Sequence, residues 1–398
     1  MKKEQVSKIA DKYFDAIVQT ASEMIQIPSL SGEEEGMAEY TKAKMKELGY
    51  DEITVDEAGS VVGIMKGTGG GKSVMLNCHL DVVDAGPADM WKHGPFSGKV
   101  ADGAVWGRGA SDTKGTFASQ LYTPYMLKQE GLLPRGDIYV VGVVHEEDAG
   151  FGAMVMAANG FKTDYAIMGE ATENDIAVSN RGRMGVEVKI IGKSCHASIP
   201  HEGANPFDFL GGFLTTLKSD FKLNKSEKYG SSCLTVTRIA SSEKGTNVIP
   251  NWIAVSMDFR SVYGDTTETV LAQVREIAEK CAVAGISVEV KAATIPITCY
   301  TGMTGEGFMG EPAFEIDENS DTVKMAKVAL EESFGREVKT KPWAFATDSG
   351  HFAQVGVEVI GFSPAEIVKC HTLEDNVMLD MLKDGIIGNL SLVSVFCK

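Results

Sequence analysis

The sequence predicts an α/β protein with a mainly parallel sheet and a smaller ferredoxin-like domain inserted into it. Up to residue 168, short apolar runs alternate with helical patterns, which is typical of parallel sheets. From Arg181 the order becomes β-α-β-β-α-β, as in a ferredoxin-like unit. A chain of 398 residues is long enough for two cores. We expect one domain at residues 1–180 and 295–398, and an inserted domain at 181–294.

The larger domain is expected to begin with an amphipathic helix, because apolar residues recur at helical spacing between Val6 and Ala21. Ser31 is expected to cap a second helix at residues 33–48. The apolar runs predict strands at 53–55, 61–65, 74–83, 137–144, 164–168 and 357–362. Helical patterns predict helices at 114–129, 152–158, 320–334 and 376–395.

The inserted domain has its own alternating pattern. Strands are predicted at 183–191, 233–239, 248–259 and 286–290, and helices at 205–218 and 266–284.

Composition excludes several classes of function. The net charge of −17 disfavours nucleic acid as a partner, since little in the chain would neutralise phosphates. No run reaches the roughly 20 apolar residues of a membrane span. The glycine-rich run at 66–73 lacks the first glycine of a phosphate-binding loop and leads into a strand instead of a helix. Seven cysteines without C-x-x-C spacing, and no signal-peptide pattern, indicate a reducing, cytoplasmic location.

The apolar run from Val74 ends in Cys78-His79-Leu80-Asp81. Side chains alternate along a strand, so His79 and Asp81 are expected on one side. His79 is a candidate metal ligand, and Asp81 is a candidate acceptor for its second ring nitrogen. The alternative is a strand-end histidine that is merely hydrogen-bonded to an aspartate.

Four further positions follow strand-like runs or a glycine-rich turn: Asp112, the pair Glu146-Glu147, Glu170 and His371. Each also has an ordinary structural explanation, such as a helix cap or a solvated turn. Together, oxygen and imidazole ligands suit zinc, manganese or cobalt, and the absence of a required cysteine favours a catalytic site. Two dications, three carboxylates and one hydroxide would be electrically neutral.

These motifs resemble those of the dinuclear metallopeptidase superfamily of aminoacylase, acetylornithine deacetylase, succinyl-diaminopimelate desuccinylase and glutamate carboxypeptidase. The resemblance covers nearly the whole chain: H-x-D at His79, G-R-G-x-x-D at Asp112, E-E at Glu146, G-E at Glu170 and C-H-T at His371. Within the superfamily the chain is most similar to the selenium-metabolism-linked hydrolases, on the motifs R-G-R-M at residue 181, G-K-S-C-H at 192 and C-Y-T-G-M-T-G-E at 299.

The resemblance implies a site for two divalent metal ions, with Zn²⁺ expected first and Co²⁺ or Mn²⁺ as alternatives. His79 and Glu170 would hold one ion, Glu147 and His371 the other, and Asp112 would bridge them.

The resemblance also implies the other roles. Glu146 would be the general base, Asp81 would orient His79, and the peptide bond between Asp112 and Thr113 would be cis. The reaction would be hydrolysis of an N-acyl amino acid or a dipeptide-type bond, with carbamoyl or ureido compounds as the alternative.

The inserted domain would be a lid that also forms a homodimer. His196 would stabilise the oxyanion, often from the partner subunit in this superfamily, and Arg260 and Asn247 would bind the substrate carboxylate. Each also has a plainer interpretation, as a loop residue or an ion-pair partner.

Two rival interpretations remain open. Cysteines directly precede His79, His196 and His371, which suggests a cysteine hydrolase. However, strand neighbours face opposite sides, which favours cysteines that pack behind the ligands. The second rival is a protein that keeps the fold and binds metal or ligand without catalysis.

Overall fold

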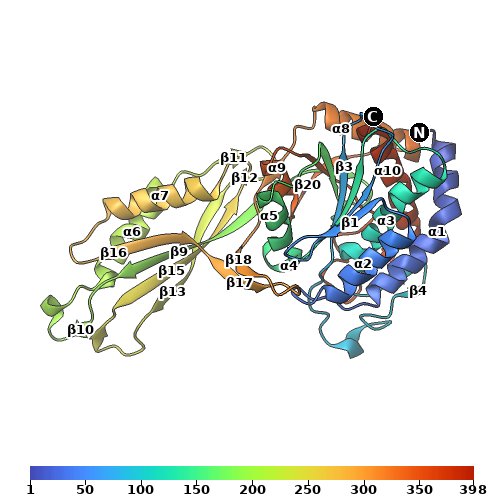
Figure 1. Cartoon of the computed structure of the whole chain (residues 1–398). Coiled ribbons are helices and arrows are strands. Elements are labelled where there is room, and N and C mark those ends of the chain that lie inside the picture. Colours follow the sequence, from blue (N-terminus) through green and yellow to red (C-terminus); the bar gives the residue numbers. More distant parts are fainter. The chain divides into compact units, whose positions relative to one another are not determined.

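The computed structural model describes residues 1–398 and divides into two compact units. Unit 1 comprises Met1–Asn180, Pro296–Gly305 and Phe314–Lys398, and unit 2 comprises Arg181–Ile295 and Glu306–Ala313. Figure 1 labels many of the elements of each unit. Residues 306–313, which the sequence places in the larger domain, belong to unit 2 because Met309 and Glu311 exchange main-chain hydrogen bonds with the 183–185 and 293 segments.

Unit 1 is built on a nine-stranded mixed sheet in the order β1-β2-β6-β3-β7-β21-β8-β19, with β20 beside β8. The strands at its centre, β6, β3, β7 and β21, run parallel, and antiparallel strands flank them. The predicted α/β class is confirmed, although only the central strands of the sheet are parallel. The strands are β1 Glu52–Val55, β2 Val61–Met65, β3 Val74–His79, β6 Ile138–Val143, β7 Tyr165–Met168, β8 Ile176–Asn180, β19 Phe314–Glu315, β20 Thr340–Trp343 and β21 Glu358–Gly361.

Helices cover the sheet of unit 1, and every residue of β3 is buried, as expected for a strand with a helical layer on each face. Helices α5 and α9 pack with one another through a core that includes Met75 and Val141, whereas α1, α3, α8 and α10 form a second contacting set. The helices are α1 Lys3–Ile25, α2 Glu35–Glu47, α3 Gly115–Gln129, α4 Glu146–Ala149, α5 Phe151–Ala158, α8 Asp321–Phe334, α9 Ser349–Gln354 and α10 Leu379–Phe396.

A small sheet of β4 Lys99–Ala101, β5 Ala104–Trp106 and β22 Asn376–Met378 completes unit 1. The last helix therefore begins at Leu379, three residues later than predicted, because 376–378 pair with β5.

The prediction that Ser31 caps the second helix is wrong. Helix α2 begins at Glu35, and no side chain caps it. The Ser31 hydroxyl instead donates to the carboxylate of Asp81 at 2.7 Å, so this loop serves the end of β3 rather than the start of α2.

Unit 2 is an antiparallel sheet in the order β13-β15-β9-β16, with the element order β-α-β-β-α-β that the sequence predicts. Residues of β9 alternate between buried and more exposed, so one face packs on α6 and α7 around Phe213 and Val274. The elements are β9 Gly182–Ile191, α6 Pro206–Asp220, β13 Cys233–Ser241, β15 Trp252–Ser261, α7 Thr267–Lys280 and β16 Ser287–Ala292. Its role as a lid or dimerisation domain stays a prediction.

Short paired segments complete the chain. They are β10 Cys195–His196 with β14 Val248–Ile249, β11 Lys225–Ser226 with β12 Gly230–Ser231, and β17 Thr294–Thr298 with β18 Thr304–Phe308. None of the helices combines the length and the apolar character that a membrane crossing requires.

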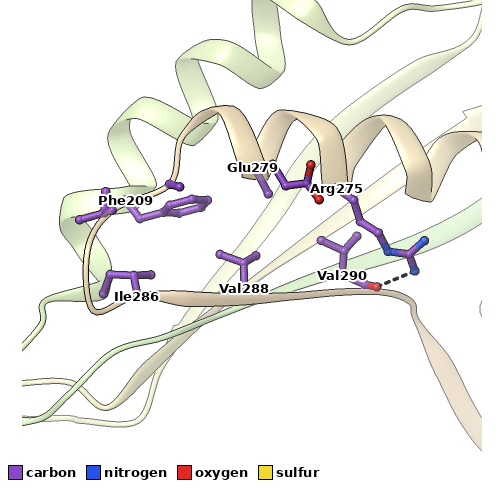
Figure 2. A pocket seen from close by; sticks show the side chains of 9 residues that line it. Phe209, Arg275, Glu279, Ile286, Val288 and Val290 are labelled. Carbon is purple, nitrogen blue, oxygen red and sulfur yellow. Dashed lines mark hydrogen bonds between the residues drawn. The ribbon is translucent and has the colours of Figure 1, made fainter.

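A cavity of about 290 Å³ lies between α7 and the edge strand β16 (Figure 2). Arg275 donates from Nη2 to the main-chain carbonyl of Val290 at 3.0 Å, which occupies a group that a free sheet edge would otherwise expose. The remaining lining is largely apolar, with Phe209, Ile286 and Val288 prominent in Figure 2. This cavity therefore offers packing surface but no cluster of catalytic groups.

Candidate metal centre

Three neighbouring parallel strands end at one edge of the unit 1 sheet, and each is followed by a predicted site residue. Strand β3 lies between β6 and β7 and ends with His79 itself. Glu146 and Glu147 open α4 directly after β6, and Glu170 follows β7 by two residues. The carboxyl ends of parallel strands are where α/β proteins gather their chemistry.

Asp112 lies between two histidines. Its Oδ1 is 2.9 Å from Nε2 of His79, and its Oδ2 is 3.0 Å from Nε2 of His371. The peptide bond between Asp112 and Thr113 is cis, as expected from the resemblance. One carboxylate thus faces both imidazoles with a different oxygen, which is the arrangement a bridging ligand needs.

The five predicted ligands form two overlapping groups whose donor atoms lie within 4.8 Å of one another. One group is His79, Asp112 and Glu170; the other is Asp112, Glu147 and His371. In the second group, Nε2 of His371 also lies 3.0 Å from Oε2 of Glu147. The oxygen and imidazole donors of both groups fit zinc, manganese or cobalt.

Added positive charge would stabilise the ionised carboxylates of this cluster. Burial and then the Glu170 carboxylate raise the pKa of Glu146 well above its usual range. Burial and then the Asp112 carboxylate do the same to the pKa of Glu170 and raise that of Glu147. Carboxylates crowded into a buried site are costly to ionise together, and divalent cations would remove that cost.

The histidines respond in the opposite sense. Hydrogen bonding to Asp112 and then to Glu147 raises the pKa of His371 to about 10. For His79, burial favours the neutral ring, but Asp112 and Asp81 outweigh it and raise the pKa. Both imidazoles thus lie in surroundings that favour positive charge, which a bound cation would also meet.

The second nitrogen of His79 is fixed by the main chain. Nδ1 lies 2.8 Å from the carbonyl oxygen of Asp81, whereas the Asp81 carboxylate is 3.6 Å away. A carbonyl only accepts, so Nδ1 carries the proton and Nε2 is left to bind an ion. The closest orienting group is therefore the Asp81 main chain, and its carboxylate binds other donors.

A cavity of about 170 Å³ opens onto this cluster. Its lining includes Glu146 and four ligand candidates together with apolar groups: Asp112, Glu147, Glu170, Phe345, Ala346, Ile367, Cys370 and His371. Glu146 belongs to neither candidate ligand group, and its side chain lines the same cavity as Asp112, Glu147, Glu170 and His371. It is therefore available to exchange protons with a bound molecule.

A protein-family model described as Peptidase family M20/M25/M40 matches residues 75–391, well over half of the chain. The chain belongs to the peptidase family M20/M25/M40. It is therefore a metal-dependent hydrolase, and the superfamily resemblance is confirmed, while the subgroup assignment stays a prediction.

Relatives of this M20 chain include the uncharacterized protein YgeY of Escherichia coli (strain K12), 29% identical over 353 residues, which are 88% of this chain and 86% of that protein. Succinyl-diaminopimelate desuccinylase of Paracoccus denitrificans is 28% identical over 312 residues, 75% of this chain and 79% of the enzyme. The structure of Bacillus subtilis YxeP, described as a dinuclear metal binding peptidase of the M20 family, aligns with a TM-score of 0.68 at 16% identity. That alignment covers 98% of this chain and 100% of YxeP, and it shows a shared fold.

The cysteines beside the M20 ligands are poor nucleophiles. Burial raises the pKa of the Cys78 thiol and of the Cys370 thiol. Cys78 donates to Oε1 of Gln120 at 3.3 Å, and Cys370 donates to the main-chain oxygen of Glu366 at 3.6 Å. A raised thiol pKa disfavours the nucleophilic thiolate, which argues against the cysteine-hydrolase interpretation.

The remaining predicted residues of the M20 chain lie in unit 2. His196 pairs with Val248 between β10 and β14, and Ala197 donates to the main-chain oxygen of Asn247 at 3.0 Å. His196 and Asn247 are therefore neighbours.

Arg260 lies elsewhere in unit 2, near the far end of β15. Gly192 follows β9 and leads toward β10, and its N–H donates to the main-chain oxygen of Asn251. Asn251 directly precedes Trp252, where β15 begins. Arg260 is eight positions beyond Trp252, about 26 Å at roughly 3.3 Å per residue. The structure of unit 2 therefore does not bring Arg260 together with His196 and Asn247.

The sequence analysis missed Arg183, which is the direct cross-strand partner of Arg260. Both arginines donate from Nε to the carboxylate of Asp258, Arg183 to Oδ2 at 2.9 Å and Arg260 to Oδ1 at 2.7 Å. The hydrogen bonds and ion pairs of both side chains run through Nε to Asp258, which leaves the Nη groups as donors for a bound molecule. The motif R-G-R-M signalled this arginine, but only the strand register reveals its partner.

Proposed function

We propose that the chain hydrolyses an amide bond, removing the acyl group of an N-acyl amino acid or cleaving a dipeptide-type bond, with two divalent cations at the cluster. The observation that supports this most is Asp112, which presents one oxygen to His79 and the other to His371. Glu146 faces the same cavity.

The proposed ligands are His79, Asp112 and Glu170 for one ion, and Asp112, Glu147 and His371 for the other. Zn²⁺ is the ion we propose first, and Co²⁺ or Mn²⁺ suit the same donors. When bound, such cations polarise a carbonyl and lower the pKa of water.

Glu146 is the proposed general base and acid. It takes one proton from the attacking water as the new C–O bond forms. It then gives that proton to the leaving nitrogen as the C–N bond breaks. Burial and the neighbouring Glu170 raise the pKa of Glu146, as suits a carboxyl that must hold a proton between the two steps.

The arginine pair of unit 2 supports a substrate with a carboxylate. Arg183 and Arg260 are held side by side by Asp258, with their Nη groups unoccupied, and guanidinium groups bind carboxylates with two parallel hydrogen bonds. The name of the Paracoccus relative, a desuccinylase, describes an acidic N-acyl substrate. We propose substrates of this acidic kind. We also propose that His196 stabilises the oxyanion and that its neighbour Asn247 contacts the substrate, both from the partner chain, since one unit 2 does not bring them together with Arg260.

Replacement of Glu146 by Gln tests the mechanism. The Glu146→Gln variant should bind metal as the wild type does, because Glu146 belongs to neither ligand group. Its kcat on the best substrate among N-acetyl amino acids, N-succinyl amino acids and dipeptides should fall by about 10²–10⁴-fold. Glu39→Gln, at an exposed position on α2, is the matched control. Equal turnover by the Glu146→Gln variant and the wild type would refute the mechanism.

A further inference from the structure

Three consecutive main-chain N–H groups at the start of α4 point to two buried carboxylates. His145 donates to Oε1 of Glu34, Glu146 donates to Oδ1 of Asp81, and Glu147 donates to Oδ2 of Asp81, each at 3.1 Å. The turn that carries Glu146, the proposed base, and Glu147, a proposed ligand, is therefore held by a hydrogen bond at each of its three N–H groups.

The backbone of His145 explains why these N–H groups converge. His145 has φ 55° and ψ 38°, which is left-handed, and helix α4 begins at the next residue. A left-handed residue beside helical ones turns successive N–H groups toward a common side and forms a nest for anions. Non-glycine residues adopt this conformation only where their surroundings hold it.

Glu34 comes from a distant part of the chain and is wholly buried at 0% exposure, whereas its neighbours Glu33 and Glu35 are exposed. Its second oxygen, Oε2, is also buried and has no hydrogen-bond partner. No side chain caps α2, so helix capping does not explain this burial. The Glu34 carboxylate accepts from the N–H of His145, and the main-chain N–H groups of Gly32 and of Glu34 itself also hydrogen-bond to it.

The segment from Ser29 to Glu34, which leads into α2, makes two further hydrogen bonds to the residues that follow β3. The Ser29 hydroxyl donates to the main-chain oxygen of Leu80 at 2.7 Å, and the Ser31 hydroxyl donates to Oδ2 of Asp81 at 2.7 Å. This segment thus contacts both the residues that follow β3 and the turn that precedes α4. This segment lies before residue 75, where the match to the family model begins.

We propose that Glu34 is a positioning residue for the metal centre: its carboxylate holds the N–H of His145 and so sets the direction of the Glu146 and Glu147 side chains. It acts through the turn and contacts neither substrate nor metal. The consequences for metal affinity and for turnover rest on the proposed function, whereas the consequence for the turn does not.

The variants separate positioning from general stability. Glu34→Ala removes the acceptor of the His145 N–H. Glu34→Gln retains an oxygen at the same place, and Glu34→Asp withdraws the carboxylate by one methylene. Glu33→Ala changes an exposed neighbour and is the matched control. Should Glu34→Ala not fold, Glu34→Asp carries the same test.

Three quantities are measured: amide hydrogen exchange in the peptide that spans residues 143–149, Co²⁺ affinity by titration, and kcat and KM. In Glu34→Ala we expect faster exchange in that peptide alone. We also expect an affinity loss of about tenfold for one Co²⁺, because Glu147 belongs to only one of the two ligand groups. In addition, kcat should fall by about 10–100-fold with KM changed far less. Glu34→Gln should stay within about threefold of the wild type in each quantity.

Unchanged exchange in the 143–149 peptide of Glu34→Ala would overturn the proposal. Equal weakening of both Co²⁺ ions together with faster exchange throughout unit 1 would also overturn it, since that result marks a general structural role. A wild-type chain that binds two Co²⁺ but hydrolyses no substrate would defeat the proposed function alone. The exchange and Co²⁺ results would still decide the role of Glu34.

Discussion

Asp112 offers each of its carboxylate oxygens to a different histidine, at 2.9 Å and 3.0 Å. This sharing divides the cluster into two ligand groups with one common member. The two groups therefore make separate predictions for single substitutions.

His79→Ala should remove one bound metal and leave the other, and His371→Ala should do the reverse. Asp112→Ala should remove both, because Asp112 is the member that the groups share. Metal analysis of each purified variant, with competition by a chelator of known affinity, measures this. His93→Ala is the control, since His93 belongs to neither group. Identical metal content in all three ligand variants would contradict the assignment.

At the scale of elements, the loop that carries Asp112 depends on a buried aspartate from the far end of the chain. Asp375 accepts from the N–H groups of Gly109 at 2.7 Å and Ser111 at 2.8 Å. It also accepts from Nη1 of Arg108 at 3.2 Å. Asp375 is fully buried and Arg108 is only 4% exposed, so neither charge has water as an alternative partner.

Asp375→Ala should lower the free energy of unfolding by about 3–5 kcal/mol, because it leaves Arg108 buried without its counter-charge. Urea denaturation measures the change. Glu374→Ala is the matched control: the Glu374 side chain is 77% exposed, and its loss should cost within about 0.5 kcal/mol. Similar costs for the two substitutions would show that the loop does not depend on Asp375.

Local patterns predicted most of the elements because each is determined by nearby residues. The strand β2 has the predicted bounds, Val61–Met65, since its apolar run is flanked by breaks on both sides. The Ser31 cap was wrong because a distant carboxylate, Asp81, competes for the same hydroxyl. The flanking antiparallel strands of the unit 1 sheet depend on pairings between distant segments, which periodicity cannot show.

The site divides in the same way. The ligand candidates were predictable because each follows a strand or a glycine-rich turn and carries a side chain with metal-binding chemistry. Glu34 was not, because three adjacent glutamates suggest a solvated helix start and nothing in the sequence marks the middle one as buried. Arg183 was missed because only the strand register shows that it lies opposite Arg260. Asp375 was missed because the main-chain groups that it binds lie 264 residues or more away along the chain.

At the scale of the whole molecule, unit 2 places His196 and Arg260 toward opposite ends of its sheet. If both residues serve one active site, as the family resemblance implies, a single unit 2 cannot supply both. A homodimer would resolve this, and we predict that each active site receives Arg260 from one chain and His196 from the other.

Mixed dimers test this arrangement. Glu146→Gln and His196→Ala chains should each be nearly inactive alone. After dissociation and random reassociation, half of the dimers are mixed and each has one intact site, so roughly a quarter of the wild-type activity should return. Light scattering during chromatography tests whether the chain forms a dimer. Absence of recovery in a verified mixed dimer would show that His196 acts within its own chain or not at all.

The central claim is that two cations at the Asp112 cluster are needed for amide hydrolysis. The most direct measurement is the metal content of the purified chain, taken with its activity on N-acetyl and N-succinyl amino acids and dipeptides before chelation, after chelation and after metal is restored. We predict about two ions per chain, with activity lost on chelation, regained with Zn²⁺, Co²⁺ or Mn²⁺, and unaffected by thiol alkylation. A chain that takes up no metal under any loading condition, or that keeps its activity in chelator, would contradict the claim.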